Sequence, residues 1–166
     1  MKIFYVHHAL RDTGNPPTQD DGLKELGIED AKITAKIFKE GTKYFNIKAI
    51  YTSNFFRCKE TARIINEKLN VPVIEDERFN ECGSVYYDGN RQETWEECQR
   101  RIMNAIRDIV FKHDEKDAVL CVTSGVNLTA FINDLDAISD DSNVKFTICI
   151  SADKSELPED IYKYIN

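Results

Sequence analysis

Short apolar runs alternate along the chain with longer stretches in which apolar residues recur every three or four positions. The short runs are rich in β-branched and aromatic residues, which predicts buried strands, and the spacing in the longer stretches predicts amphipathic helices. The first run begins at residue 2 and ends in His7 and His8, and a loop-forming stretch with an Asn-Pro-Pro sequence follows it. We therefore expect an N-terminal strand that carries two histidines at its carboxyl end.

The later runs continue this alternation of strand and helix. The run at residues 118–122 is continuously apolar, as in a central strand covered on both faces, and Pro72 places the third run at a sheet edge or a strand start. Such alternation defines an α/β fold, which we expect to be a three-layer sandwich with a mostly parallel central sheet and helices on both faces. The expected strands are residues 2–8, 47–51, 71–74, 118–122 and 144–150, and the expected helices are residues 23–40, 55–69, 94–110 and a segment after 125.

Two features refine this picture of the helices and loops. Ile33 and Ile37 form an apolar stripe beside the main apolar face of the first helix, and we assign Trp95, at the start of the third helix, to the core. Residues 76–91 are polar, contain two glycines and show no clear period. A long loop of this kind is often functional.

Length, composition and charge limit the classes of partner. We interpret the 166 residues as one domain over residues 1–166, and 42% hydrophobic with 31% charged residues is an ordinary soluble composition. The net charge of −7 argues against a nucleic-acid partner, which needs a basic surface. No apolar run approaches the ~18 residues of a membrane span. We expect neither a nucleic-acid nor a membrane partner, although a small local anion site needs only a few positive groups.

The cysteines suggest a reducing environment. Five scattered cysteines include no Cys-x-x-Cys pair, and the N-terminus carries no signal-peptide pattern. We therefore expect buried, reduced thiols and a cytoplasmic location. The cysteines are Cys58, Cys82, Cys98, Cys121 and Cys149.

Polar side chains follow three of the expected strands. His7 and His8 end the first, Ser53 follows the second with Arg57 one turn into the next helix, and Ser124 follows the fourth. In an open α/β sheet ligands bind beyond the carboxyl ends of the strands, and helix N-termini there favour anions such as phosphate. Arginine binds phosphoryl oxygens, histidine can attack phosphorus, and a loop carboxylic acid can protonate a leaving oxygen.

A structural histidine and a metal site are the other readings of this histidine pair. The metal reading is disfavoured because neighbouring strand residues point to opposite faces, and no histidine or cysteine cluster accompanies the pair.

Five segments in order resemble those of the histidine phosphatase superfamily, the phosphoglycerate-mutase-like group. The resemblance spans about residues 2 to 150 and implies a phosphoglycerate-mutase-like fold. The segments are His7-His8-Ala9 after the first strand, the Leu-Lys-Glu-Leu-Gly helix start at 23–27, the strand-to-helix segment at 51–62, the acidic stretch at 75–81, and the strand ending in Thr-Ser-Gly at 119–125.

The resemblance implies roles for six residues and also shows two departures. His8 would be the nucleophile that forms a phosphohistidine, and Glu81 would protonate the leaving oxygen and then activate water. Substrate-binding residues would be Arg57, His7, Arg11 and Ser124, with no metal and no cofactor. His7 stands where the family has an arginine and Ser124 where it has a second histidine, and Arg11 is a candidate replacement for the missing cation.

Two functions of different classes follow from these residues. The first is a phosphatase that hydrolyses a small phosphomonoester through a phosphohistidine, with weakened activity. The alternative is a catalytically inactive family member that binds a phosphorylated ligand or a protein partner. In either case the expected ligand is a small phosphorylated molecule or inorganic phosphate, and the sequence leaves the oligomeric state open.

Overall fold

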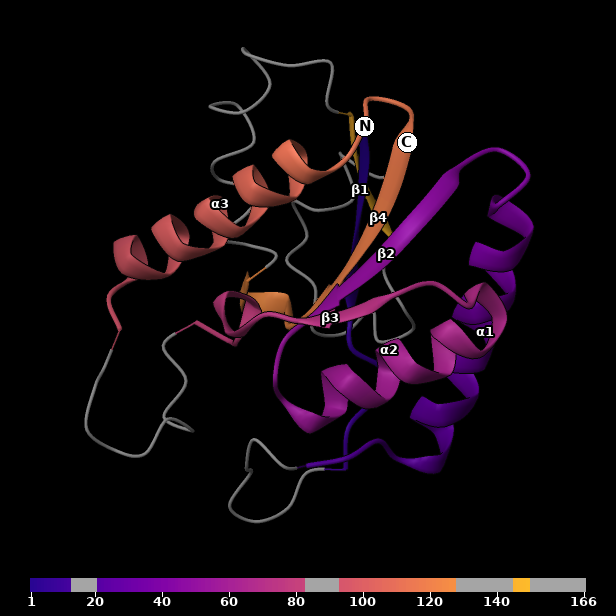
Figure 1. The fold of residues 1–166 in the computed structure, drawn as a ribbon. Helices are drawn as coiled ribbons and strands as arrows, with labels where there is room; N and C mark the ends of the chain where they lie inside the picture. Colours follow the sequence, from indigo (N-terminus) through magenta and orange to yellow (C-terminus); the bar gives the residue numbers. More distant parts are fainter. Residues whose placement is uncertain (13–20, 83–92, 128–144, 150–166) are drawn as a thin grey trace.

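The structure is a computed structural model that describes residues 1–12, 21–82, 93–127 and 145–149, and Figure 1 draws the other residues as a grey trace. Strands and helices alternate along the described chain. In order they are β1 (Lys2–His7), α1 (Glu25–Gly41), β2 (Asn46–Thr52), α2 (Phe56–Leu69), β3 (Val73–Glu75), the 3-10 turn η1 (Glu77–Phe79), α3 (Trp95–Lys112), β4 (Asp117–Thr123) and β5 (Lys145–Cys149).

These strands form one sheet in the order β3-β2-β4-β1-β5, in which each neighbouring pair is parallel. In Figure 1, α1 and α2 cover one face of the sheet and α3 covers the other. The expected α/β fold with a parallel sheet and helices on both faces is therefore confirmed. Most of the helix expected after residue 125 lies outside the described residues, and one domain over residues 1–166 stays a prediction.

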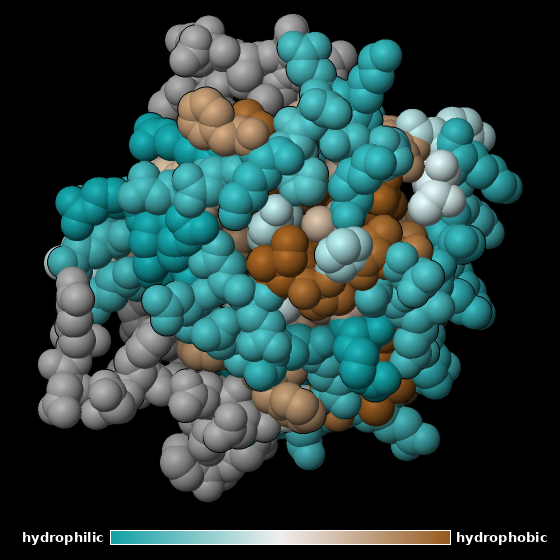
Figure 2. Space-filling model, in the orientation of Figure 1, coloured by the Kyte–Doolittle hydropathy of each residue, from teal (hydrophilic) through white to brown (hydrophobic). Residues whose placement is uncertain are grey.

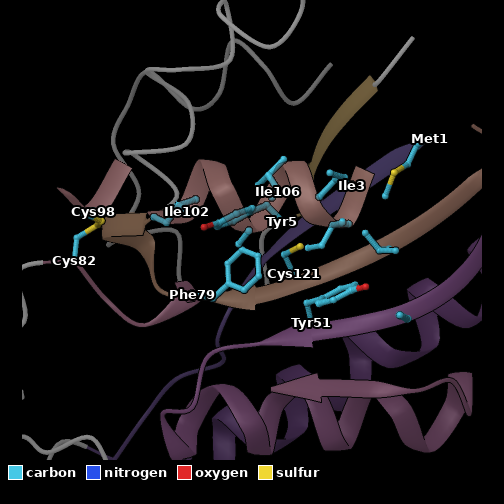
Figure 3. Close-up of a cluster of buried hydrophobic side chains, with 14 residues drawn as sticks. Met1, Ile3, Tyr5, Tyr51, Phe79, Cys82, Cys98, Ile102, Ile106 and Cys121 are labelled. Carbon is cyan, nitrogen blue, oxygen red and sulfur yellow. A yellow bond between two sulfur atoms is a disulfide. The ribbon is translucent and has the colours of Figure 1, made fainter. Parts of the chain in front are cut away.

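The side chains of β1 alternate between two cores, one on each face of the sheet. Ile3 and Tyr5 belong to the core under α3, while Phe4 and Val6 belong to the core under α1 and α2. This follows from the opposite directions of successive strand side chains. Figure 3 shows Tyr5 beside Ile106 of α3 in the first of these cores. Burial on both faces fixes the position of the strand and hence of its carboxyl end.

The central and edge strands lie where the sequence predicts. All residues of β4 are buried between β1 and β2, as the continuous apolar run indicates. The short strand β3, which follows Pro72, lies at the sheet edge. Its Val73 and Ile74 are 42% and 38% exposed, and Figure 2 shows apolar residues on the face of the molecule over which β3 runs.

Three side chains expected on apolar faces are exposed instead. Ile33 and Ile37 are 53% and 55% exposed, because each lies two positions, or ~200° of helix rotation, after the buried Ala31 and Ala35. One face of α1 therefore packs on the sheet and α2, and the neighbouring stripe faces away. Trp95 is 38% exposed because it is the first residue of α3, and the buried stripe of that helix begins three residues later.

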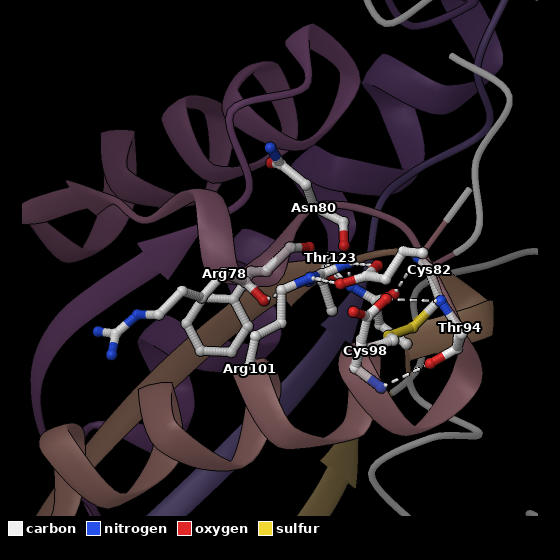
Figure 4. Close-up of a disulfide and its surroundings, with 11 residues drawn as sticks. Arg78, Asn80, Cys82, Thr94, Cys98, Arg101 and Thr123 are labelled. Carbon is white, nitrogen blue, oxygen red and sulfur yellow. Dashed lines mark hydrogen bonds and ion pairs between the residues drawn. A yellow bond between two sulfur atoms is a disulfide. The ribbon is translucent and has the colours of Figure 1, made fainter. Parts of the chain in front are cut away.

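The prediction that all cysteines are reduced thiols is wrong for two of them. Cys82 and Cys98 form a disulfide that joins the segment after η1 to α3 (Figures 3 and 4). Cys58 and Cys121 are buried thiols, and burial raises the pKa of Cys58 to about 12. The pairing went unpredicted because it depends on where the segment after η1 packs against α3, which no local spacing shows.

The disulfide should contribute measurably to stability. It joins residues 16 apart, and closing a loop of about that length stabilises a fold by about 3 kcal/mol in the chain-entropy model. We expect a reducing agent to lower the free energy of unfolding in urea by roughly that amount. The variant with both Cys82→Ser and Cys98→Ser should be insensitive to the reductant. Identical urea curves for the original protein with and without reductant would contradict the linkage.

Candidate active site

The carboxyl ends of three strands meet at one edge of the sheet. Because β2, β4 and β1 are parallel neighbours, the residues that follow them leave the sheet side by side. The backbone N–H of His8 donates to the carbonyl of Thr123 at 2.9 Å, and that of Ser53 donates to Val122 at 3.1 Å. The polar strand ends singled out in the sequence are therefore assembled by the sheet itself.

The imidazole of His8 is oriented by hydrogen bonds at both nitrogens. Its Nδ1 lies 2.8 Å from the carbonyl oxygen of Ala9, and its Nε2 lies 3.2 Å from Nε of Arg57. A carbonyl only accepts and a guanidinium only donates, so the network assigns the proton to Nδ1 and a lone pair to Nε2. This neutral tautomer presents Nε2 as a nucleophile.

The surroundings of His8 favour the neutral ring. Burial is the largest cause that lowers its pKa well below 6.5, and the neighbouring His7 lowers it further. The positive charges of Arg57 and Arg11 act in the same direction, and the bond to the Ala9 carbonyl opposes them. His8 therefore remains unprotonated at neutral pH.

Arg57 is a buried cation with partners on several sides. It lies in the first turn of α2, and its side chain is 1% exposed. Besides donating to His8, it donates from Nη2 to Oε2 of Glu81 at 2.7 Å, and its Cζ lies 4.7 Å from the ring centroid of Phe55. A single guanidinium thus joins the end of β1 to the acidic segment after η1.

Thr61 ties α2 to the residue after His8. Its hydroxyl donates to the carbonyl of Arg57 at 2.8 Å and accepts from the backbone N–H of Ala9 at 3.1 Å. One side chain four residues after Arg57 therefore sets the distance between the helix and the histidine loop. This contact gives a physical reason for a threonine in the strand-to-helix segment at 51–62.

Gly27 brings the start of α1 close to the same loop. A Cβ atom at this position would lie 2.1 Å from the carbonyl oxygen of Leu10, so only glycine allows the approach. The backbone N–H of Lys24 donates to that carbonyl at 3.0 Å. The glycine of the segment at 23–27 thus serves the packing of the loop that follows His8.

Glu81 is held in place through the residue before it. Asn80 is buried, and its Oδ1 accepts from the hydroxyl of Ser53 at 2.9 Å and from the N–H of Asn54 at 2.8 Å. The hydroxyl of Thr123 donates to the carbonyl of Phe79 at 2.6 Å. Figure 4 shows Asn80, Cys82 and Thr123 gathered at this segment.

The structure also places the other three predicted site residues. His7 is buried, and its Nδ1 donates to the carbonyl of His8 at 2.6 Å. Ser124 is 2% exposed, and within the described residues its hydroxyl makes no hydrogen bond. Arg11 pairs with Asp21 at 3.7 Å. Arg57 therefore contacts both His8 and Glu81, and phosphate binding by His7, Ser124 and Arg11 stays a prediction.

Two residues of this region were missed by the sequence reasoning. The only sequence signal for Asn80 is its position next to Glu81. Asn127 lies three residues after Ser124, with no pattern around it. Both are buried amides whose contacts are to distant backbone. Such contacts leave no periodic trace in a sequence.

Two further properties concern the described part of the chain. No group of three or more His, Cys, Asp or Glu side chains within it could hold a metal ion. None of the helices within it has the length and apolar character needed to cross a bilayer.

Comparison with known proteins supports the relationship that the motifs indicate. The model of the histidine phosphatase superfamily (branch 1) matches residues 13–91. YhfR of Bacillus stearothermophilus is 22% identical over 89% of this chain and 87% of its own, with a TM-score of 0.64. A mycobacterial glucosyl-3-phosphoglycerate phosphatase in complex with inorganic phosphate is 20% identical over 79% and 76%, with a TM-score of 0.63.

A third similar structure is phosphoglycerate mutase from Plasmodium falciparum, at 24% identity over 79% of this chain and 66% of its own, with a TM-score of 0.53. No curated protein sequence matches the chain. The fold is thus of the phosphoglycerate-mutase-like class. The shared fold and the family match together confirm the resemblance to the histidine phosphatase superfamily.

The protonation state of His8 can be observed directly. Because its folded-state pKa lies well below 6.5, the folded chain leaves the ring neutral on acidification, whereas the unfolded chain takes up a proton near pH 6.5. Long-range ¹⁵N–¹H NMR spectra should show the neutral Nδ1–H tautomer of His8 at pH 7 and still at pH values below 6.5. A His8 signal that titrates at the ordinary value would contradict the described environment.

Proposed function

We propose that the protein is a phosphatase that hydrolyses a small phosphomonoester through a phosphohistidine on His8, with weakened activity. The observation that supports this most is one line of contacts from His8 Nε2 to Arg57 Nε at 3.2 Å and from Arg57 Nη2 to Glu81 Oε2 at 2.7 Å. A neutral imidazole, a permanent cation and a carboxyl group are the groups that phosphoryl transfer to histidine and then to water requires.

In the first step Arg57 Nε turns from His8 to the phosphoryl oxygens. The freed lone pair of His8 Nε2 attacks phosphorus, and the bond between phosphorus and the ester oxygen breaks. Once the phosphoryl group displaces Glu81 from Arg57, the carboxylate takes up the proton of the phosphate monoanion and gives it to that ester oxygen, so that a neutral alcohol leaves. Arg57 binds the phosphoryl oxygens and offsets their charge. The Nδ1 bond to the Ala9 carbonyl, 2.8 Å long, stabilises the positive ring of the phosphohistidine.

In the second step water attacks the phosphorus of the phosphohistidine. The Glu81 carboxylate removes a proton from this water, the Nε2–P bond breaks, and its electron pair returns to His8. Glu81 passes this proton to the inorganic phosphate, which leaves. His8 is again neutral, and the Glu81 carboxylate pairs with Arg57 again.

Weakened activity follows from the way in which Arg57 is already occupied. A phosphoryl group has to share Nη2 with Glu81 or displace it, so binding exchanges one anion for another. The family resemblance further implies that His7 and Ser124 replace two phosphate-binding residues. One preorganised donor of this kind typically contributes roughly 3–4 kcal/mol to a transition state.

The alternative is an inactive family member that binds a phosphorylated ligand or a protein partner. The observation that favours it is Ser124, whose buried hydroxyl cannot supply the positive charge of a second histidine. The mycobacterial phosphatase bound to inorganic phosphate supports a small phosphorylated ligand under both proposals.

Hydrolysis of p-nitrophenyl phosphate between pH 4 and 8 separates the two. We expect His8→Ala to reduce the rate to background, because the nucleophile is lost. Arg57→Lys should reduce kcat/KM by at least about tenfold, because lysine lacks the forked donor. Arg63→Lys is the matched control, since this arginine lies on the same helix but is exposed, and it should leave the rate unchanged.

Equal rates for the original protein and His8→Ala would reject the proposal that the protein is a phosphatase. If vanadate still binds to the original protein in that case, and binds less well to Arg57→Lys, the inactive binding protein is the correct reading.

A second experiment asks whether the two departures from the family pattern limit the rate. Combining His7→Arg with Ser124→His should raise kcat/KM for the same substrate by about tenfold or more, because it restores two phosphate-binding donors. Each single variant serves as its comparison, since coupled donors do not act additively. No gain in the combined variant would show that other geometry limits the reaction.

A further inference from the structure

The carboxamide of Asn127 makes hydrogen bonds to the backbone on both sides of Glu81. Its Nδ2 donates to the carbonyl of Phe79 at 2.7 Å and to that of Asn80 at 2.9 Å, and its Oδ1 accepts from the N–H of Cys82 at 2.7 Å. The backbone immediately before and immediately after Glu81 is therefore bonded to one side chain.

This amide is itself fully fixed. Asn127 is 0% exposed, and its Nδ2 also lies 2.9 Å from the hydroxyl of Thr123, the last residue of β4. Its two N–H groups are shared among three acceptors and its oxygen accepts one bond, all within the described residues. A buried polar side chain with every hydrogen bond made is rigid, because any movement would leave a polar group without a partner.

The contacts connect the acidic segment to the strand on which the nucleophile is aligned. β4 lies beside β1, and the carbonyl of Thr123 accepts from the N–H of His8 at 2.9 Å. Asn127 bonds to the hydroxyl of that same Thr123 and to the backbone around Glu81. Asn127 and Thr123 thus fix the position of Glu81, the proton carrier, relative to His8, the nucleophile.

We propose that Asn127 is a positioning residue for general acid catalysis by Glu81. The inference rests on the proposed phosphatase function and adds a residue that the family resemblance does not supply. Asn127 touches no reacting atom; it holds the segment so that the Glu81 carboxyl can meet the leaving oxygen when a phosphoryl group has displaced it from Arg57.

A misplaced acid has a specific kinetic signature. A leaving group that is a weak base, such as 2,4-dinitrophenolate, departs without a proton, whereas an alkoxide requires one. Loss of acid positioning should therefore slow hydrolysis of phenethyl phosphate much more than hydrolysis of 2,4-dinitrophenyl phosphate. The ratio of the two rates is measured on the same sample, so it is independent of the fraction of folded enzyme.

The test compares kcat/KM for both substrates in Asn127→Ala, Asn127→Asp and Glu81→Gln. We expect Asn127→Ala and Glu81→Gln to lower the phenethyl rate by about tenfold or more relative to the dinitrophenyl rate. Asn127→Asp should do so at least as strongly as Asn127→Ala, because its second oxygen cannot donate to the carbonyls of Phe79 and Asn80 and faces them instead. Asn104→Ala, an exposed asparagine on α3, is the control and should leave the ratio unchanged.

The outcomes separate this inference from the proposed function. If the original protein hydrolyses neither substrate, the phosphatase proposal fails and the inference falls with it. If Glu81→Gln changes the ratio and Asn127→Ala lowers both rates equally, the function stands and the positioning role is rejected. Failure of both Asn127 variants to fold would also reject it and make Asn127 a residue of the fold.

Discussion

The active edge of this fold depends on one buried charge, the guanidinium of Arg57. Removing such a group from water costs several kcal/mol unless hydrogen-bond partners surround it. His8 accepts from its Nε, Glu81 accepts from its Nη2, and the Phe55 ring lies 4.7 Å from its Cζ. These partners come from the end of β1, the segment after η1 and the turn before α2, so satisfying one side chain aligns three segments. Losing one partner of a buried ion pair typically costs about 3–5 kcal/mol.

The pair of Arg57 and Glu81 orders the site and also limits its binding of a phosphoryl group. Glu81 is the counter-ion of Arg57 and, in the proposed reaction, also the proton carrier. An incoming phosphoryl group competes for the nitrogen that the carboxylate already occupies, at 2.7 Å. The Glu81 side chain can move away from Arg57 while its backbone stays fixed, because Asn80 and Asn127 hold the backbone on either side of Glu81. The side-chain contact with Arg57 therefore stabilises the resting site, and the backbone contacts keep Glu81 in position for the reaction.

Much of this arrangement could be predicted from the sequence. Strand-and-helix alternation predicts parallel strands, parallel strands end at one edge, and His8 and Arg57 follow two of those ends. Periodicity indicates which face of a helix is apolar, but not where the buried stripe begins along it, so the predicted core position of Trp95 is wrong. The disulfide between Cys82 and Cys98 and the hydrogen bonds of Asn127 to the backbone around Glu81 depend on how distant segments pack, and no local pattern encodes either.

A crystal structure of the protein grown with orthovanadate tests the central claim most directly. Vanadate adopts the five-coordinate geometry of phosphoryl transfer, and transition-state analogues bind far more tightly than substrates. The account predicts vanadium bonded to Nε2 of His8, equatorial oxygens within hydrogen-bond distance of Arg57, and the Glu81 carboxyl beside the apical oxygen opposite His8. Vanadate bound elsewhere, with the Arg57–Glu81 pair intact, would contradict the account.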